Sequence, residues 1–299
     1  MVTLASTESS FFTRRRSLFL KFANELNYRC QLIKSVGHLP LLSQVDRNIC
    51  RELDRTGIVI TSLETLGLPS TSLLTEAIRR FLPQLKQSTI AGNLSENRRA
   101  AASHCLYGDP VVVGRDFPAI YLWGLEERLL NILENYYGAP VVCIGANVRR
   151  DLADGQQQGT KLWHLDGEDR KVVKVAVYLN DIDDKGGPFE YIPDRLSPSY
   201  KDFPSSVISD EDMETVVPAS QWKACEGPKG TVIIADNARL FHHGKLPMRD
   251  RYVVFYAYAY RHPKRPEFCQ NSPWRKGLPF IREKLSQRQK DAIWNYKGL

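Results

Sequence analysis

The order of the predicted elements constrains the fold of this chain more than any other feature. Up to Gly138 the sequence is dominated by helical patterns, and after Gly138 it consists of short β-rich runs separated by Gly, Pro, Asp and Asn. Apolar residues recurring every three or four positions indicate amphipathic helices, whereas short β-branched and aromatic runs between turn residues indicate strands. Helices followed by many short strands predict a sheet core with helices packed on one side, and therefore an α+β architecture that is mainly β.

Three helices and one strand are predicted before Gly138. The first helix follows from an apolar stripe made of Leu18, Phe19, Phe22, Leu26, Cys30 and Ile33. The segment 71–85 carries a second stripe, made of Leu74, Ile78, Phe81 and Leu82. The clearest helix begins at residue 119 and ends at Gly138, with Pro140 beyond it as a stop signal. Between the first two helices, "GIVITSL" has the β-branched density of a short strand.

Six β-rich runs follow Gly138 and supply the predicted sheet. They span residues 140–148, 160–167, 171–181, 187–193, 230–238 and 251–260. The segment 197–218 interrupts them and is polar and acidic. Long excursions between strands are often functional lids, so we interpret this one as a lid-like loop.

Bulk composition is that of a folded protein. The chain has 299 residues, of which 42% are hydrophobic and 25% charged, and it is long enough to bury a sizeable core. No apolar run approaches the roughly 20 residues that a membrane span needs, and no cleavage site follows the basic and apolar N-terminus. Six scattered cysteines without a C-x-x-C pair predict free thiols in a reducing compartment, so we expect a cytoplasmic protein.

The net charge of +7 is concentrated near the C-terminus. From Arg261 onward there are ten Lys and Arg against three Asp and Glu, which leaves 31 of each sign in the rest of the chain. Such a segment is either a solvated basic tail or a surface for an acidic partner. It carries no recognised nucleic-acid motif, no aromatic-interleaved basic patch and no helix-turn-helix signal, so we expect no nucleic-acid partner.

A metal site is suggested by His164 and Asp166, which lie two residues apart in a β-rich run. Side chains at that spacing point to the same face of an extended backbone, as metal ligands or as ordinary surface residues. The downstream segment "LFHHGK" adds His242 and His243. Two histidines and one carboxylate on one side of a metal, with open positions on the other, are typical of non-haem Fe(II) oxygenases. A distant histidine would therefore complete the site.

The motifs around these residues resemble a known family. "WHLD", "YLND", "GGPFEYIP", "LFHHG" and "RYVVFYAY" occur in this order over roughly residues 140 to 260. This pattern resembles the phytanoyl-CoA dioxygenase-like group of iron- and 2-oxoglutarate-dependent oxygenases. Such proteins commonly continue Gly-Ser-His after "YIP", whereas residues 194–196 here are Asp-Arg-Leu, which leaves the identity of the substrate open.

The resemblance assigns roles to residues at matching positions. It makes His164 and Asp166 the near pair of iron ligands, and it favours His242 over His243 as the distal ligand. Neighbouring strand residues face opposite ways, so only one of these two histidines is expected to reach the metal. Arg251 matches the arginine that holds the far carboxylate of 2-oxoglutarate through a two-pronged hydrogen bond, with Arg249 as a nearby competitor.

Further residues are predicted to line the site. Asn147 lies on the strand before the metal pair and is assigned to the cosubstrate. Tyr178 and Lys174 share one face of their strand, and they either line the pocket or are ordinary sheet positions with the lysine extending outward. Trp163 alternates with His164, so we expect it to pack away from the metal.

The resemblance also implies the fold and the activity. We expect a double-stranded β-helix, or jelly roll, with N-terminal helices packed on one sheet, in a single domain 1–299. Its parts would be a helical region 1–138, a β-helix core 139–262 and a basic tail 263–299. The implied activity is hydroxylation, or another oxidation, of an unactivated C–H bond with Fe(II), 2-oxoglutarate and O2, releasing succinate and CO2. The substrate would be a small molecule or lipid-like, and the alternative is a non-catalytic jelly roll that binds a metal or ligand.

Overall fold

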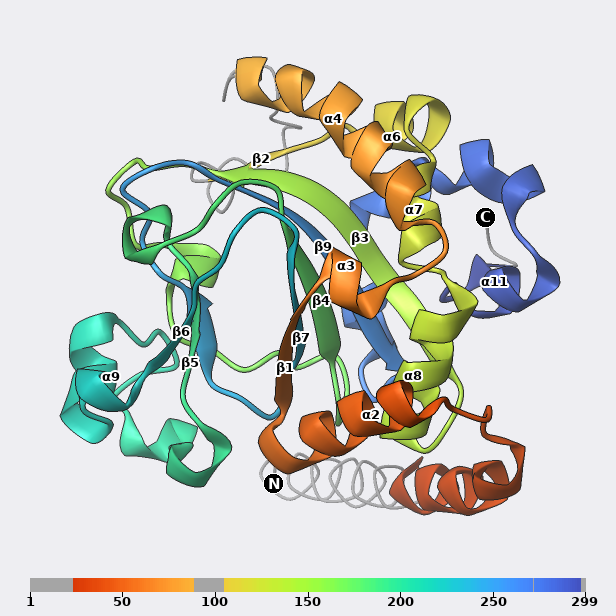
Figure 1. Ribbon diagram of the computed structural model, residues 1–299. Helices are drawn as coiled ribbons and strands as arrows, with labels where there is room; N and C mark the ends of the chain where they lie inside the picture. The colour runs from red at the N-terminus through yellow and green to blue at the C-terminus, as the bar shows by residue number, and fades with distance from the viewer. Residues whose placement is uncertain (1–23, 89–104, 271, 297–299) are drawn as a thin grey trace, which may run out of the picture.

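The computed structural model describes residues 24–88, 105–270 and 272–296, and in it two antiparallel sheets face each other (Figure 1). The larger sheet has the order β1 (Ile58–Ser62), β7 (Thr231–Asp236), β4 (Val173–Tyr178), β9 (Arg251–Tyr260), β3 (Val141–Asp151) and β2 (Cys105–Tyr107). The smaller sheet has the order β6 (Lys223–Cys225), β5 (Phe189–Tyr191) and β8 (His242–Gly244). This arrangement is a jelly roll, so the predicted fold class is confirmed.

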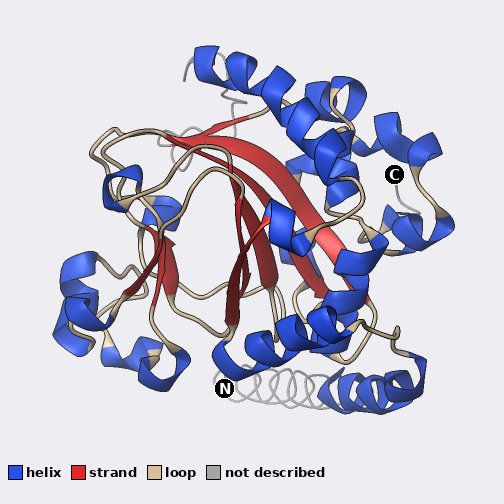
Figure 2. Cartoon of the chain, in the orientation of Figure 1, coloured by secondary structure: helices blue, strands red, loops and turns tan. Residues whose placement is uncertain are grey.

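Helices cover the outer face of the larger sheet (Figure 2). Besides the helical residues 24–35, the described α-helices are α2 (Gln44–Thr56), α3 (Leu63–Leu66), α4 (Thr71–Gln87), α6 (Pro110–Asp116), α7 (Ala119–Trp123), α8 (Glu127–Tyr137), α9 (Asp210–Val216), α10 (Pro266–Cys269) and α11 (Gln287–Asp291). The apolar faces of α2, α4, α7 and α8 and one face of the large sheet form the main buried core, whereas α9 packs in a separate small cluster. Within the described part of the chain, no helix combines the length and the apolarity that crossing a membrane requires.

The pleat of β4 separates this core from the space between the sheets. Its valines belong to the helix-covered core, whereas Lys174, Ala176 and Tyr178 alternate with them and point toward the small sheet. The predicted common face of Lys174 and Tyr178 is therefore the face that lines a cavity. The strand predicted from "GIVITSL" is β1, and the second predicted helix is α4, whose Leu74, Ile78 and Phe81 are buried as expected.

The helix predicted to run unbroken from residue 119 is divided into α7 and α8. The division falls at Gly124, where an added Cβ atom would lie 2.2 Å from the ring of Tyr256. The Tyr258 hydroxyl also donates a hydrogen bond to the Gly124 carbonyl oxygen at 2.6 Å. Close packing of Gly124 against β9 thus divides the predicted single helix into α7 and α8. The predicted end is correct, because Gly138 has a φ of +73° and caps α8.

The apolar stripe predicted for the first helix is wrong in its described part. Residues 24–35 are helical, but Leu26, Cys30 and Ile33 are exposed, and Leu18, Phe19 and Phe22 lie outside the described residues. Tyr28 and Leu32 pack on the core instead. Tyr28 makes an edge-to-face contact with Tyr260 at 5.2 Å between ring centroids, and the Arg170 guanidinium lies 4.2 Å from the centre of its ring.

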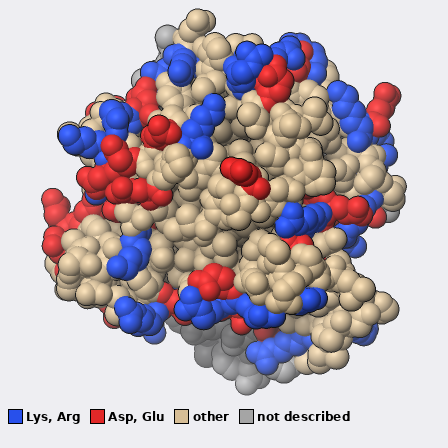
Figure 3. Space-filling model, viewed as in Figure 1, with Lys and Arg blue, Asp and Glu red and all other residues tan. Residues whose placement is uncertain are grey.

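The excursion 197–218 and the basic C-terminal segment are both folded. The excursion contains α9, and its Phe203, Ile208, Met213 and Val217 form a small core with Trp163 and Phe241. The C-terminal segment buries Trp274, Leu278 and Ile281 in the main core, so it is more than a solvated tail. On the face shown in Figure 3, basic and acidic side chains are interspersed around the rim, and the positive excess forms no single patch there. All six cysteines are free, as predicted.

Candidate metal centre

The structure brings His164, Asp166 and His242 together between the two sheets. One potential ligand atom from each lies within 4.8 Å of the other two. His242 is the first residue of β8, and His164 pairs with it through two backbone N–H···O=C bonds of 3.0 Å. The Asp166 N–H donates to the Asn237 carbonyl oxygen at 2.9 Å. The run 160–167 is thus held by a short 3₁₀ turn (Gly159–Lys161) and isolated bridges, and not by the continuous strand that its sequence predicted.

Both imidazoles use Nδ1 for a backbone hydrogen bond, which leaves Nε2 as the possible ligand atom. His164 Nδ1 lies 2.8 Å from the Leu162 carbonyl oxygen, and His242 Nδ1 lies 2.9 Å from that of Leu240. A carbonyl oxygen only accepts, so each Nδ1 carries the proton and each Nε2 carries a lone pair. Burial lowers the pKa of both histidines, His242 more strongly, so both are neutral at pH 7. Neutral imidazoles are the form that binds a metal.

Asp166 is ionised and forms an ion pair with Lys174. Burial would raise its pKa, but Lys174 and the two imidazoles hold the pKa at about 2. The Lys174 Nζ lies 2.6 Å from Asp166 Oδ2, and Asp166 Oδ1 lies 3.9 Å from His164 Nε2. Burial and the Asp166 charge raise the pKa of Glu168, which also lines the cavity.

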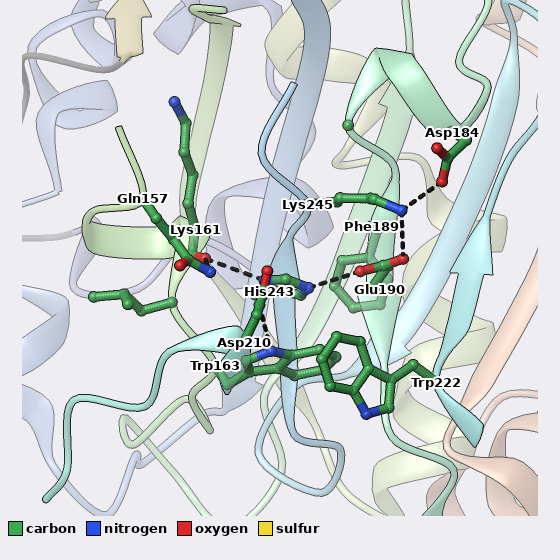
Figure 4. Close-up of polar contacts among 12 residues, drawn as sticks. Gln157, Lys161, Trp163, Asp184, Phe189, Glu190, Asp210, Trp222, His243 and Lys245 are labelled. Carbon is green, nitrogen blue, oxygen red and sulfur yellow. Dashed lines mark hydrogen bonds and ion pairs between the residues drawn. The ribbon is translucent and has the colours of Figure 1, made fainter. Parts of the chain in front are cut away.

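His243 belongs to a separate polar cluster with Glu190, Lys161 and Asp210 (Figure 4). It is fully buried, with Nε2 2.9 Å from Glu190 Oε2 and Nδ1 3.1 Å from the Lys161 carbonyl oxygen. Its ring stacks on Trp163 at 3.8 Å between centroids, and Trp163 donates to Asp210 at 2.8 Å. Both ring nitrogens of His243 are therefore occupied. Trp163 packs away from the ligand cluster, as its alternation with His164 predicted.

Asn237 is a site residue that the sequence reasoning missed. Its Nδ2 lies 2.8 Å from His242 Nε2 and donates to the lone pair that a metal would use. Its Oδ1 is buried and has no hydrogen-bond partner in the structure. The only sequence signal is its position after Asp236, in the turn that the aspartate organises by accepting from the Ala238 N–H at 3.2 Å.

A cavity of about 280 Å³ adjoins the ligand cluster. Its walls include the predicted residues Asn147, Tyr178 and Arg251, together with Lys174 and Arg149. Its apolar walls are formed by Ile144, Ala176, Phe189, Phe255, Ala257 and Phe268. Phe268 lies in α10, so the C-terminal segment contributes to the cavity. None of the cavity residues comes from 197–218, so the predicted lid is not part of this wall.

Two of the cavity arginines, Arg149 and Arg251, both contact the carboxylate of Asp151. Asp151 Oδ2 accepts from Arg251 Nε at 2.7 Å, and Asp151 Oδ1 lies 2.9 Å from Arg149 Nε. Arg251 also donates to the Gly187 carbonyl oxygen, and the Arg149 guanidinium lies 4.3 Å from the centre of the Phe255 ring. Burial would raise the pKa of Asp151, but the two guanidinium groups lower it below its ordinary value. One excess positive charge therefore remains among these buried groups.

The other predicted cosubstrate residues differ in their freedom to bind. Asn147 Oδ1 is buried without a hydrogen-bond partner and lines the cavity. The Tyr178 hydroxyl donates to the Cys225 carbonyl oxygen of β6 and accepts from the Phe189 N–H of β5, both at 2.9 Å. The hydroxyl is therefore occupied, and only the ring of Tyr178 contributes to the cavity wall. Arg249 is exposed and pairs with Asp183, away from the cavity.

No protein-family model matches the sequence, and no curated protein matches it. Similar solved structures include EctD from S. alaskensis with 2-oxoglutarate and 5-hydroxyectoine, at 18% identity and a TM-score of 0.49 over 75% of this chain and 80% of that one. HygX from Streptomyces hygroscopicus with nickel, 2-oxoglutarate and hygromycin B has 18% identity and a TM-score of 0.45 over 73% and 88%. The epimerase SnoN with Fe3+, alpha ketoglutarate and nogalamycin RO has 14% identity and a TM-score of 0.46 over 76% and 90%.

Proposed function

We propose that this protein is an iron- and 2-oxoglutarate-dependent oxygenase of the phytanoyl-CoA dioxygenase-like group. The observation that supports it most is the meeting of His164, Asp166 and His242 beside a cavity. Two neutral imidazoles with their Nε2 lone pairs directed inward and one ionised carboxylate are the donor set that non-haem Fe(II) requires. The orphaned Asn237 Oδ1 and the Asn237 donor on His242 also mark a site built for a further polar occupant.

Arg251 is the residue we assign to the distal carboxylate of 2-oxoglutarate. It is 3% exposed, lines the cavity and lies on the strand after the distal histidine. Asp151 neutralises only one of the two guanidinium groups that contact it, so a second carboxylate would complete the pairing. A carboxylate between two guanidinium groups accepts charge-assisted hydrogen bonds from both, which strengthens its binding.

Iron(II) and 2-oxoglutarate, when bound, activate dioxygen so that 2-oxoglutarate leaves as succinate and CO2 while a substrate C–H bond is oxidised. The chain's own residues bind these groups, orient them and exclude water from them. Asp166 would supply one ligand to the iron, so we assign hydroxylation, or another oxidation of the same carbon, and not halogenation. The cavity of about 280 Å³ is close to the lower end of the roughly 300–1,000 Å³ of small-molecule sites, which supports a small or lipid-like substrate.

The test is oxygen-dependent conversion of 2-oxoglutarate to succinate by the iron-loaded protein, measured by mass spectrometry with a panel of small molecules. We expect turnover by the wild type and none by His164→Ala, Asp166→Ala or His242→Ala. His243→Gln is the matched control, because its side chain lies on the opposite face of β8 and should leave turnover intact. A wild-type protein that binds neither cobalt(II) nor 2-oxoglutarate would overturn the proposal.

A jelly roll that binds a metal or ligand without turnover is the second candidate. The observation in its favour is that Asn237 and Lys174 already occupy His242 and Asp166. The same experiment separates the two candidates. Binding of cobalt(II) and 2-oxoglutarate without any succinate in the presence of iron, oxygen and the panel would support the binding protein.

A further inference from the structure

Lys174 is a feature of the candidate metal centre that the three-ligand set does not require. It is the second residue of β4, and its neighbours across the sheet are Ala235 on β7 and Ala257 on β9. The two alanines leave room for the lysine chain to extend along the sheet surface. Its Nζ ends 2.6 Å from Asp166 Oδ2.

This contact gives the two oxygens of Asp166 different roles. Oδ2 is held by the ammonium group, whereas Oδ1 lies on the side of the imidazoles, 3.9 Å from His164 Nε2. A carboxylate can bind a metal ion through one oxygen or through both. Because the ammonium group contacts Oδ2, Oδ1 is the oxygen that remains available to bind a metal ion.

On the basis of the proposed function, we propose that Lys174 is a positioning residue that keeps Asp166 a one-oxygen metal ligand. The coordination position that Oδ2 would otherwise take then stays open for 2-oxoglutarate. The ammonium charge beside the site also attracts this dianion.

Loss of Lys174 should affect the affinity for the metal and the affinity for 2-oxoglutarate differently. Lys174 repels a divalent cation, and its removal frees Oδ2 to bind, so the loss of Lys174 should not weaken metal binding. The same loss removes both a free coordination position and a positive charge, so 2-oxoglutarate should bind more weakly. A lysine that only supported packing would, when removed, weaken the binding of both.

The experiment compares Lys174→Met with Lys174→Arg and with the control Lys171→Met, all as full-length chains. Lys171 is also on the segment leading into β4, but its Nζ donates to the Tyr136 carbonyl oxygen at 2.8 Å and does not line the cavity. Cobalt(II) is titrated into the metal-free protein, and 2-oxoglutarate is then titrated into the cobalt-loaded protein. Calorimetry gives both dissociation constants, and visible absorption reports the cobalt coordination.

We expect Lys174→Met to bind cobalt(II) at least as tightly as the wild type, and 2-oxoglutarate about tenfold more weakly, since losing about 1.4 kcal/mol of charge attraction is a factor of ten in the dissociation constant. Lys174→Arg should restore most of the 2-oxoglutarate affinity, and Lys171→Met should match the wild type. Unchanged 2-oxoglutarate affinity in Lys174→Met, or weaker cobalt binding, would overturn the inference. Failure of the wild type to bind cobalt(II) would instead overturn the proposed function. If Lys174→Met does not fold, Lys174→Gln provides the same neutral comparison.

Discussion

The adjacent histidines of β8 give the sharpest test of the site, because one belongs to the candidate ligand cluster and the other to a separate buried polar cluster. His242 faces the ligand cluster, whereas His243 is fully buried between Glu190 and the Lys161 carbonyl oxygen. Replacing His243 should therefore cost stability and leave metal binding intact. Replacing His242 should abolish metal binding.

The cost of His243→Ala can be worked out from its contacts. The substitution removes a hydrogen bond to a carboxylate, worth about 1.5–3 kcal/mol, and a stacking contact with Trp163 worth about 0.5–1.5 kcal/mol. It also leaves Glu190, which is 7% exposed, with Lys245 Nζ at 3.5 Å as its remaining ionic partner. We expect the free energy of unfolding to fall by about 2–4.5 kcal/mol, the sum of these two contributions.

Urea denaturation measures this loss, and cobalt(II) titration of the folded fraction measures the metal affinity. His243→Gln is the control variant, since its amide can still donate to Glu190 and should recover part of the stability. Wild-type stability in His243→Ala would refute the account of its contacts. Loss of metal binding in His243→Ala, together with retention in His242→Ala, would show that the two residues have the reverse roles.

Three further predictions concern the cosubstrate, pH and the reaction. Arg251→Met should weaken 2-oxoglutarate binding by on the order of 3–5 kcal/mol in calorimetry, because a buried carboxylate loses its cation, while Arg249→Met should bind normally. Equal losses in the two variants would contradict the assignment. Burial lowers the pKa of His164 and His242, so in acid the unfolded chain takes up protons there that the folded one does not. Their contribution to stability is full above the unfolded pKa of about 6.5 and is lost below it, by up to about 1.4 kcal/mol per pH unit for each imidazole. Urea midpoints of the metal-free protein at pH 7 and pH 5 should show this slope, and a variant lacking both histidines should show a shallower one. Product analysis in excess chloride should find no chlorinated product, because Asp166 fills the position that a halide would need; a chlorinated product would mean that Asp166 is not a ligand.

Local patterns in the sequence determined the elements and the members of the site. The change at Gly138, the apolar spacing of α4 and the β-branched runs were enough to predict helices followed by a sheet core, because each depends on residues close together in the chain. The jelly roll itself was expected from the family resemblance. The His164 and Asp166 pair and a distant histidine were also evident, since a metal ligand set needs particular side chains. Strand alternation placed Lys174 and Tyr178 on one face, and they share it in the structure.

Only the tertiary structure decided which face of each element is covered and which charges meet. Alternation separates His242 from His243, but the pairing of β8 with β5 places His243 opposite Glu190 and turns His242 toward the ligands. The described part of the stripe on the first helix, Leu26, Cys30 and Ile33, was periodic and yet exposed, because periodicity shows which residues share a face and not what packs against it. The partners of Arg251 and Asp166 depend on strand register across the sheet. Burial makes such pairs strong, and it arises from contacts between residues far apart in the sequence, so local patterns did not predict them.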